Sequence, residues 1–203
     1  MTRIVLASTS AARRLLLTNA GVAFESIAAP IDERALEEPL LESGASPSEI
    51  ALALAEAKAR AVLALAPDAV VIGSDQMLDL AGERLVKPGS RAGAAAQIAR
   101  LAGRSHVLRT AVVIAEGGDV VWRHLASATL TMRPLSAAAI ERYLDAAGEG
   151  IHGSVGAYHL EGVGIRLFTT IEGDYFSILG LPLLPLLSQL RAMGAFDHDE
   201  DQT

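Results

Sequence analysis

The triplet Ser74-Asp75-Gln76 places a carboxylate directly after a strongly apolar segment. That segment, residues 69–73 (AVVIG), is a continuous apolar run of the kind expected for a strand buried on both faces. Open α/β sheets bind ligands beyond the carboxyl ends of their strands. A carboxylate at that place can hold a metal ion or take a proton from water. Asp75 is therefore the first candidate for a catalytic group, and the alternative is an aspartate that only caps the next turn.

The segment from Ser8 to Arg14 combines hydroxyl groups with two arginines. It joins a short polar loop to a helix expected over residues 11–19, for which Ser10 is the expected N-cap. The free N–H groups and the positive dipole end of a helix N-terminus attract anions. Guanidinium groups such as that of Arg13 bind phosphate oxygens well. The segment is thus a candidate phosphate site, and the alternative is an ordinary capped helix with surface arginines.

Two lysines and a glutamate are candidates to complete a site for a phosphate chain. Lys58 lies in an alanine-rich helix expected over residues 50–66, and Lys87 precedes a proline in a loop. Helix lysines are usually solvated, so both lysines gain interest only if a phosphate chain lies between them. Glu33 is expected in an acidic loop, where it could offer a second carboxylate to a metal ion. The alternative is that this loop is only a solvated acidic segment.

Two further features allow a structural or a functional interpretation. His106 begins a predicted strand, where a histidine is more often structural than a substrate contact. The glycine-rich segment from Gly156 to Gly162 offers a tyrosine ring and a carboxylate that suit recognition of a nucleobase. Glycine loops also often serve only to turn the chain. The sequence contains no Walker A motif, so that familiar phosphate loop is absent.

The elements that must position these side chains alternate between strands and helices along the chain. The helix expected over residues 50–66 has a start signal in Ser46-Pro47-Ser48-Glu49, and Ser136 is another expected cap. This order predicts an α/β fold. The remaining predictions are strands over residues 3–7, 22–27, 105–115, 120–132 and 165–171, helices over residues 91–101, 136–145 and 183–192, and turns within residues 79–84 and 116–119.

Composition narrows the class of protein. The chain has 203 residues, of which 51% are hydrophobic and 4% aromatic, with a net charge of −7 and no cysteine. One domain is predicted over residues 1–194, followed by an acidic, disordered tail over residues 195–203. No basic stripe is visible, so we expect no nucleic-acid partner. No apolar run is long enough for a signal segment or a membrane span, and we expect a soluble, cytoplasmic protein that does not bind membranes.

A series of motifs from about residue 6 to residue 190 resembles the Maf (septum-formation-inhibitor-like) family of nucleotide pyrophosphatases. The resemblance implies an inosine-triphosphatase-like α/β fold, with a mixed twisted sheet, helices and two lobes around a central cleft. It implies hydrolysis of a nucleoside triphosphate to a monophosphate and pyrophosphate, assisted by Mg²⁺ or Mn²⁺, and a homodimer. The motifs are LASTSAARRLLL, IDER, AEAKA, VIGSDQ, VKP, LAGRSHVLRT, GAYHLEGVGIRLF and EGDYFSILGLPL.

The family motifs also imply a role for each matching residue. Asp75 becomes the catalytic base, and Glu33 assists it at the metal ion. The resemblance implies that the phosphates are held by Ser8, Arg13, Lys58 and Lys87.

Three other positions are those at which the family varies with substrate. Gln76 and Glu161 are similar to the branch that acts on 7-methyl-GTP, whereas many members have threonine and glutamine there. Ala12 departs from the pattern, because the family has an arginine or a tryptophan at this position. The preferred base is therefore an open question.

Three other functions compete with this one. The first is a non-enzymatic nucleotide-binding regulator of cell division, which would have no need of Asp75 beside two lysines. The second is a phosphomonoesterase, which would release orthophosphate in place of pyrophosphate. The third is an α/β domain in which every motif is structural.

Overall fold

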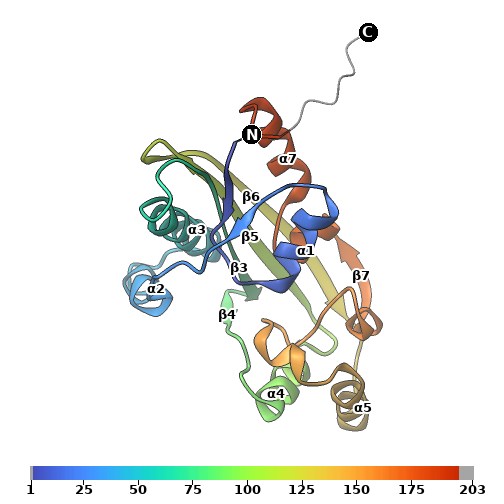
Figure 1. Ribbon diagram of the computed structural model, residues 1–203. Helices are drawn as coiled ribbons and strands as arrows, with labels where there is room; N and C mark the ends of the chain where they lie inside the picture. The colour runs from blue at the N-terminus through green and yellow to red at the C-terminus, as the bar shows by residue number, and fades with distance from the viewer. Residues whose placement is uncertain (1, 197–203) are drawn as a thin grey trace. The chain divides into compact units, whose positions relative to one another are not determined.

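The computed structural model describes residues 2–196 (Figure 1). Contacts within the chain divide them into two compact units. Three long strands pass from one unit into the other, so both units are discontinuous in sequence. The single domain expected over residues 1–194 stays a prediction, and most of the predicted tail, residues 197–203, lies outside the described residues. Unit 1 holds residues 2–76, 110–126 and 180–196, and unit 2 holds residues 77–109 and 127–179.

Within residues 2–196, seven strands pair in one mixed sheet. The hydrogen-bonded order is β2-β1-β3-β5-β6-β7, and β4 pairs with β3. β1 is parallel to β2 and β3, whereas β4 is antiparallel to β3 and β7 to β6. The strands are β1 (Ile4–Leu6), β2 (Glu25–Ser26), β3 (Val70–Leu80), β4 (Glu83–Leu85), β5 (Ser105–Glu116), β6 (Asp119–Met132) and β7 (Phe168–Glu172).

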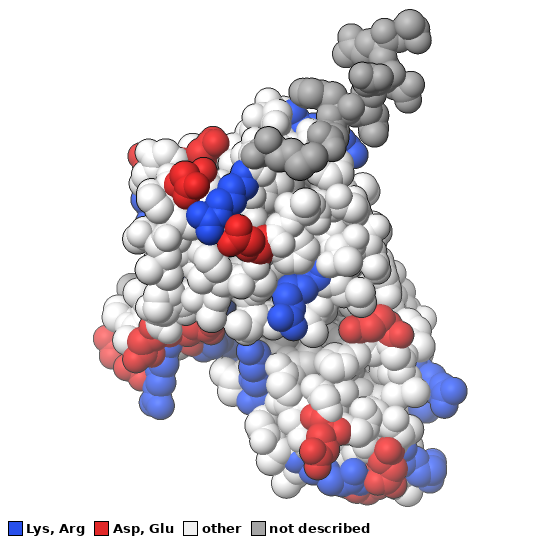
Figure 2. All heavy atoms as spheres, viewed as in Figure 1, with Lys and Arg blue, Asp and Glu red and all other residues white. Residues whose placement is uncertain are grey.

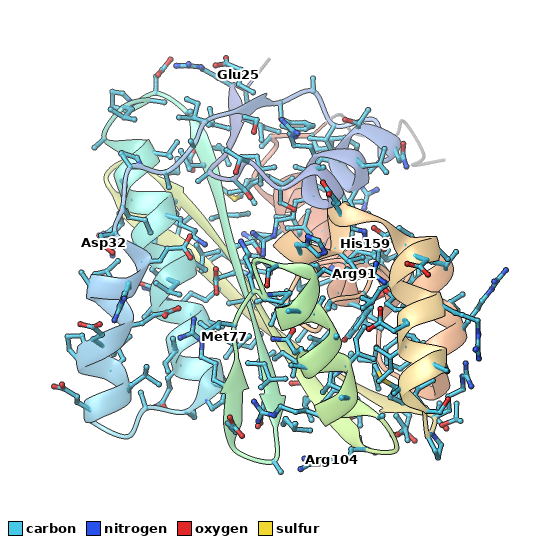
Figure 3. All side chains as sticks on the ribbon, turned by 90° about the horizontal axis from the view of Figure 1, so that it is seen from below. Glu25, Asp32, Met77, Arg91, Arg104 and His159 are labelled. Carbon is cyan, nitrogen blue, oxygen red and sulfur yellow. The ribbon has the colours of Figure 1, made fainter. Side chains whose placement is uncertain are left out.

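Local signals in the sequence account for the helices of unit 1. The Ser10 hydroxyl accepts a hydrogen bond from the Arg13 N–H and caps α1 (Ala11–Asn19). Ser46 and Glu49 form a capping box at the predicted start of α3 (Pro47–Leu63). The Asp32 carboxylate caps α2 (Glu33–Glu42), at the start of which Figure 3 shows its side chain. The last helix of this unit is α7 (Leu183–Ala192).

Close packing of α3 on β3 brings a helix residue near the middle of the strand. A Cβ atom at Gly73 would lie only 2.2 Å from the Ala55 carbonyl oxygen and 2.8 Å from the Ala59 Cβ atom. Only glycine on the strand and small residues on the helix permit this approach. Lys58, between the two alanines on α3, is therefore held against β3 and its Asp75 side chain.

Unit 2 packs helices and short helical turns on the other parts of the long strands. Its helices are α4 (Arg91–Leu101), α5 (Ala137–Ala147) and α6 (Tyr175–Ile178), with 3₁₀ turns η1 (Glu149–Gly153) and η2 (Val163–Leu167). The turn between β3 and β4 places Ala81 and Gly82 at positive φ, as a tight hairpin requires. The core includes Ile98, Leu101, Leu108, Leu130, Met132, Leu144 and Leu160.

Most predicted elements are confirmed, including the helices over residues 91–101 and 183–192, but four expectations are wrong. The strand predicted over residues 165–171 begins only at Phe168, because Val163–Leu167 form η2. Ser74-Asp75-Gln76 does not end a strand, because β3 continues to Leu80 and pairs with β4. Glu33 is not in a loop but begins α2. This helix was not predicted because it contains Pro39, and proline disfavours the interior of a helix. The predicted strand over residues 22–27 is reduced to Glu25–Ser26. The enclosure of a cleft by two lobes stays a prediction.

No helix within the described chain combines the length and the apolar character that crossing a membrane requires. On the face of the molecule shown in Figure 2, basic and acidic side chains lie next to one another. Exposed ion pairs of the molecule include Arg3 with Glu25 in unit 1 and Arg91 with Glu141 in unit 2. Because water screens exposed charges, these pairs contribute little to the stability of the fold.

Candidate active site

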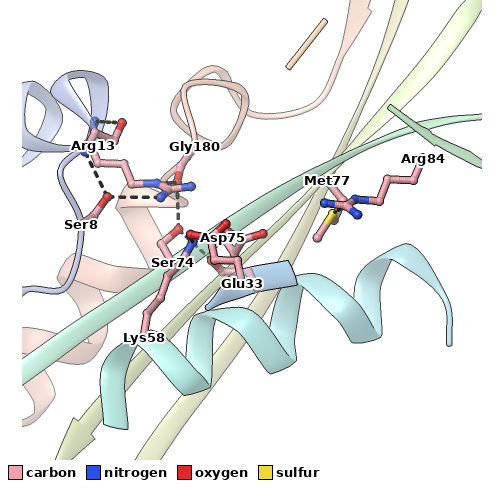
Figure 4. A network of polar contacts seen from close by, with 11 residues as sticks. Ser8, Arg13, Glu33, Lys58, Ser74, Asp75, Met77, Arg84 and Gly180 are labelled. Carbon is pink, nitrogen blue, oxygen red and sulfur yellow. Dashed lines mark hydrogen bonds and ion pairs between the residues drawn. The ribbon is translucent and has the colours of Figure 1, made fainter. Parts of the chain in front are cut away.

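A buried ion pair between Lys58 and Asp75 is the centre of the polar network in unit 1 (Figure 4). The Lys58 Nζ atom lies 2.5 Å from Asp75 Oδ1 and 2.9 Å from Glu33 Oε1. Lys58 is only 8% exposed and Asp75 only 7%, whereas Glu33 is largely exposed. One ammonium group thus lies between two carboxylates, of which one is withdrawn from water. Burial of a charge has a large cost in free energy, so the presence of a buried ion pair points to a role other than stabilisation of the fold.

Arg13 brings a second cation to the same network. Its Nε atom donates to the Gly180 carbonyl oxygen at 2.7 Å, and its Nη1 atom donates to the Ser8 hydroxyl at 3.4 Å. Burial lowers the pKa of Arg13, and the nearby charges of Asp75 and Glu33 act in the opposite direction. The guanidinium group remains charged, because arginine keeps its proton in proteins. The alternative interpretation, a capped helix with surface arginines, therefore does not hold for Arg13. It does agree with Arg14, which is exposed.

The Gly180 carbonyl group is a positioning element that the sequence did not reveal. It lies 2.9 Å from the hydroxyl of the buried residue Ser74, which also lies 2.8 Å from the Ala111 carbonyl oxygen. Gly180 has φ +97°, and a Cβ atom there would lie 3.2 Å from Arg13 Nε. Only glycine adopts this conformation readily and leaves room for the guanidinium group. A signal existed in the motif EGDYFSILGLPL, which supplied no role for its glycines.

Gln76 is held by a partner from the neighbouring strand. Its Nε2 atom donates to the Thr110 hydroxyl at 2.9 Å, and Thr110 is 1% exposed. β-branched side chains such as threonine are stiff at χ1, so the Thr110 hydroxyl is a fixed anchor for the Gln76 amide. Thr110 ends the motif LAGRSHVLRT, and nothing in that motif predicts a role for it.

The predicted site residues fall into two groups. The structure brings Ser8, Arg13, Glu33, Lys58 and Asp75 into one network of contacts in unit 1. Ala12, half-buried on α1, and Gln76 belong to the same unit. Lys87 and Glu161 belong to unit 2, where both are exposed.

His106 has a structural environment in unit 2. It is 1% exposed, and its Nε2 atom lies 2.7 Å from the Tyr158 hydroxyl oxygen. Burial lowers the pKa of His106 to about 4 and raises the pKa of Tyr158, so both rings are uncharged at neutral pH. The Tyr158 ring also packs edge-on against Phe168, with centroids 4.8 Å apart. Both rings thus serve the core of unit 2, as the structural interpretation of His106 predicted.

The carboxylates of Asp75 and Glu33 have the chemistry that Mg²⁺ and Mn²⁺ prefer, because hard divalent cations bind oxygen ligands. Both carboxylates contact the Lys58 ammonium group, so a metal ion bound close to that group would contact both carboxylates. Residues 2–196 contain no group of three or more metal-ligating side chains. A metal held here would therefore need oxygen ligands from water or substrate besides the two carboxylates.

Fold and site together define an α/β protein with a buried, ion-paired polar network. The chain matches the family model described as "Maf-like protein" over residues 3–193. It is 56% identical over 194 residues to the "7-methyl-GTP pyrophosphatase" of Rhizobium meliloti (strain 1021), covering 96% of this chain and 98% of that protein. It is 52% identical over 194 residues to "Nucleoside triphosphate pyrophosphatase 1" of Jannaschia sp. (strain CCS1), with the same coverage. The chain therefore belongs to the Maf family, and the resemblance is confirmed.

Proposed function

We propose that this chain is a nucleoside triphosphate pyrophosphatase, which converts a nucleoside triphosphate and water to the monophosphate and pyrophosphate. The observation that carries the proposal is the buried pair of Lys58 and Asp75, with the exposed Glu33 on the same ammonium group and Arg13 nearby, in a member of the Maf family. The names of its relatives from Rhizobium meliloti and Jannaschia support the same reaction.

The first requirement of the reaction is neutralisation of the triphosphate. Cleavage of a phosphoanhydride develops negative charge on several oxygens, and catalysis depends largely on groups placed in advance to meet it. Arg13 and Lys58 supply two fixed cations in unit 1, and Ser8 adds a hydroxyl donor. Lys87, in unit 2, is the further cation that the family motifs imply for the phosphates.

The second requirement is an activated water molecule. Water provides the new P–O bond while the bond between the α and β phosphates breaks, and pyrophosphate leaves. Asp75 takes the proton that water loses, because its carboxylate is a base held at one position by Lys58. In this proposal Asp75 accepts the proton and Lys58 holds Asp75 in position, which gives a reason for burying a carboxylate beside an ammonium group.

A divalent cation is the proposed cofactor. Asp75 and Glu33 would hold it, and it would supply positive charge to the phosphates when bound. Lys58 already contacts both carboxylates, so it keeps them close together before any cation arrives. A preference for Mg²⁺ or Mn²⁺ agrees with a donor set made only of oxygen.

The proposed substrate preference is for 7-methyl-GTP. Gln76 and Glu161 support it, because both match the branch with this substrate, and relatives at 50–56% identity carry its name. The amide of Gln76 donates and accepts hydrogen bonds, whereas the carboxylate of Glu161 accepts from N–H groups of a base. Ala12 leaves out the ring or guanidinium group found elsewhere in the family.

The decisive experiment is a panel of nucleoside triphosphates that includes 7-methyl-GTP and unmodified GTP, with Mg²⁺, Mn²⁺ or a chelator. We expect the highest kcat/KM with 7-methyl-GTP, equal amounts of monophosphate and pyrophosphate, and no turnover with the chelator. Release of orthophosphate alone would establish a phosphomonoesterase. Binding without turnover of any nucleotide would establish the regulator and overturn the proposal.

Location and assembly complete the proposal. The proposed location is the cytoplasm, which agrees with a nucleotide substrate, and the proposed assembly is the homodimer that the family resemblance implies. Light scattering of the purified chain at several concentrations tests the dimer directly.

A further inference from the structure

Gln97, on α4 in unit 2, is a buried amide that was not among the predicted site residues. It is 9% exposed, and both ends of its side chain have a partner in the backbone. Its Nε2 atom donates to the Val86 carbonyl oxygen at 2.7 Å, and its Oε1 atom accepts from the Gly156 N–H at 2.7 Å. A carbonyl group can only accept and an N–H group can only donate, so these partners fix the orientation of the amide.

The two backbone partners belong to the two loops that carry the proposed substrate contacts of unit 2. Val86 directly precedes Lys87, and Gly156 begins the segment that leads to Glu161. A second link joins the same loops, because the Gly89 N–H donates to the His152 carbonyl oxygen at 3.0 Å. Gln97 is thus a side-chain connection between loops far apart in sequence.

The loop at Gly156 needs such support because its backbone is strained. Gly156 has φ +85° and Ala157 has φ +58°, in the left-handed region that alanine rarely adopts. A Cβ atom at Gly156 would lie 2.4 Å from the Tyr158 ring. Strained backbone persists only where the surroundings hold it, and here Gln97 holds Gly156 while the Tyr143 hydroxyl donates to the Ala157 carbonyl oxygen at 3.0 Å.

We propose that Gln97 is a positioning residue that couples Lys87 to the loop of Glu161, so that phosphate binding and base recognition in unit 2 depend on one another. The inference rests on the proposed function, which gives Lys87 a phosphate and Glu161 a base. A buried amide with two short backbone contacts sets the separation of both loops together. Loss of the amide leaves the Gly89–His152 hydrogen bond in place but removes both side-chain contacts, so each loop can shift more independently of the other.

A double-mutant cycle tests the coupling. Gln97→Met keeps the length of the side chain but removes both hydrogen bonds. We expect it to lower kcat/KM for the preferred nucleotide about tenfold and to weaken discrimination against other bases. Coupled residues give non-additive effects, so Lys87→Ala should cost about ten times less in the Gln97→Met protein than in the wild type. Equal costs in both backgrounds would overturn the proposal.

Tyr143→Phe is the matched control. It removes one hydrogen bond from the same strained turn, because the Tyr143 hydroxyl donates to the Ala157 carbonyl oxygen rather than to the Lys87 loop. The effects of Tyr143→Phe and Lys87→Ala on kcat/KM should therefore multiply within about twofold. Coupling as strong as that of Gln97→Met would mean that any loosening of the turn has this effect, and it would also overturn the proposal.

Gln97→Glu separates the two contacts and serves if Gln97→Met does not fold. Its carboxylate can still accept from Gly156 but has no donor for Val86. Non-additivity with Lys87→Ala should remain, while the ranking of nucleotides stays near that of the wild type. Additive effects of Gln97→Glu and Lys87→Ala on kcat/KM would contradict the proposed coupling. A wild-type protein that releases no pyrophosphate from any nucleotide contradicts the proposed function itself, whereas an active wild type with additive variants contradicts only the role of Gln97.

Discussion

The two units of this protein bury polar groups in different ways. Unit 1 buries charged side chains besides neutral ones such as Ser74, and the buried Lys58 and Asp75 contact one another. In unit 2 the buried polar side chains are neutral and bind each other or the backbone, as His106 does with Tyr158 and Gln97 with two loops. Burial of a charge is stable only with a compensating charge, whereas a neutral group needs only a hydrogen-bond partner.

This difference indicates a division of labour. Unit 1 holds charged side chains at fixed positions, which suits the binding of a polyanion and the transfer of a proton. In unit 2, neutral hydrogen bonds hold a strained turn and two loops in one conformation. Loss of a buried charge in unit 1 should therefore impair the chemistry or leave the partner charge uncompensated. Loss of a neutral hydrogen bond in either unit should act mainly on stability or on the choice of substrate.

Asp75→Asn should have the largest effect. We expect kcat to fall by about two to four orders of magnitude, because removal of a general base usually costs that much. Nucleotide affinity should stay close to that of the wild type, since the amide keeps the size of the carboxylate. Steady-state kinetics and calorimetric binding measure the two effects. Near-normal turnover in a folded variant would remove Asp75 from the role of base and unit 1 from the role of chemistry.

Lys58→Met should destabilise unit 1 by about 3 to 4 kcal/mol, because a buried carboxylate loses its ammonium partner. The double variant with Asp75→Asn should recover most of that stability, since no uncompensated charge then remains. The matched control is Arg60→Met on the same helix, whose pair with Asp119 is exposed and should matter little. Urea unfolding measures all three. Equal losses for Lys58→Met and Arg60→Met would contradict the proposed importance of burial.

Acid should weaken unit 2 through His106. Its pKa falls from 6.5 in the unfolded chain to about 4 in the folded protein, so between these pH values the unfolded chain binds more protons. Stability therefore rises with pH across that window and drops by about 3 kcal/mol on acidification from pH 7 to pH 4. His106→Gln should remove this part of the pH dependence. The measurement is urea unfolding of both proteins at several pH values, and identical slopes would show that His106 does not titrate as burial requires.

Thr110→Val should have the smallest effect. It removes the hydroxyl that accepts from Gln76 but keeps the shape of a buried side chain. We expect about a tenfold loss in the preference for 7-methyl-GTP over GTP, the scale of one hydrogen bond, with kcat changed less. Thr110→Ser should restore the preference because it keeps the hydroxyl. A variant with unchanged preference would show that Gln76 does not read the base.

Local signals predicted much of this fold. The cap at Ser10 and the capping box at Ser46 are encoded within four residues, and the tight turn near Gly82 by residues next to one another. Such signals act over the distances along the chain that periodicity and capping rules cover. Predictions from these local signals were wrong where residues distant in sequence, or a residue with an unusual position in a helix, determined the structure. β3 continues past Asp75 because it pairs with β4, and α2 forms in spite of Pro39.

The sequence by itself determined the family and the chemical types of the site: a carboxylate after VIGS, lysines in AEAKA and VKP, and an arginine in the first helix. Only the tertiary structure decided how they meet. Arg13 and Gly180 are 167 positions apart, and Gln97 reaches Gly156 across 59 positions. No periodic pattern encodes such pairs, because they arise when separate elements pack together. The ion pair of Lys58 and Asp75 likewise exists because small residues let α3 approach β3 at Gly73.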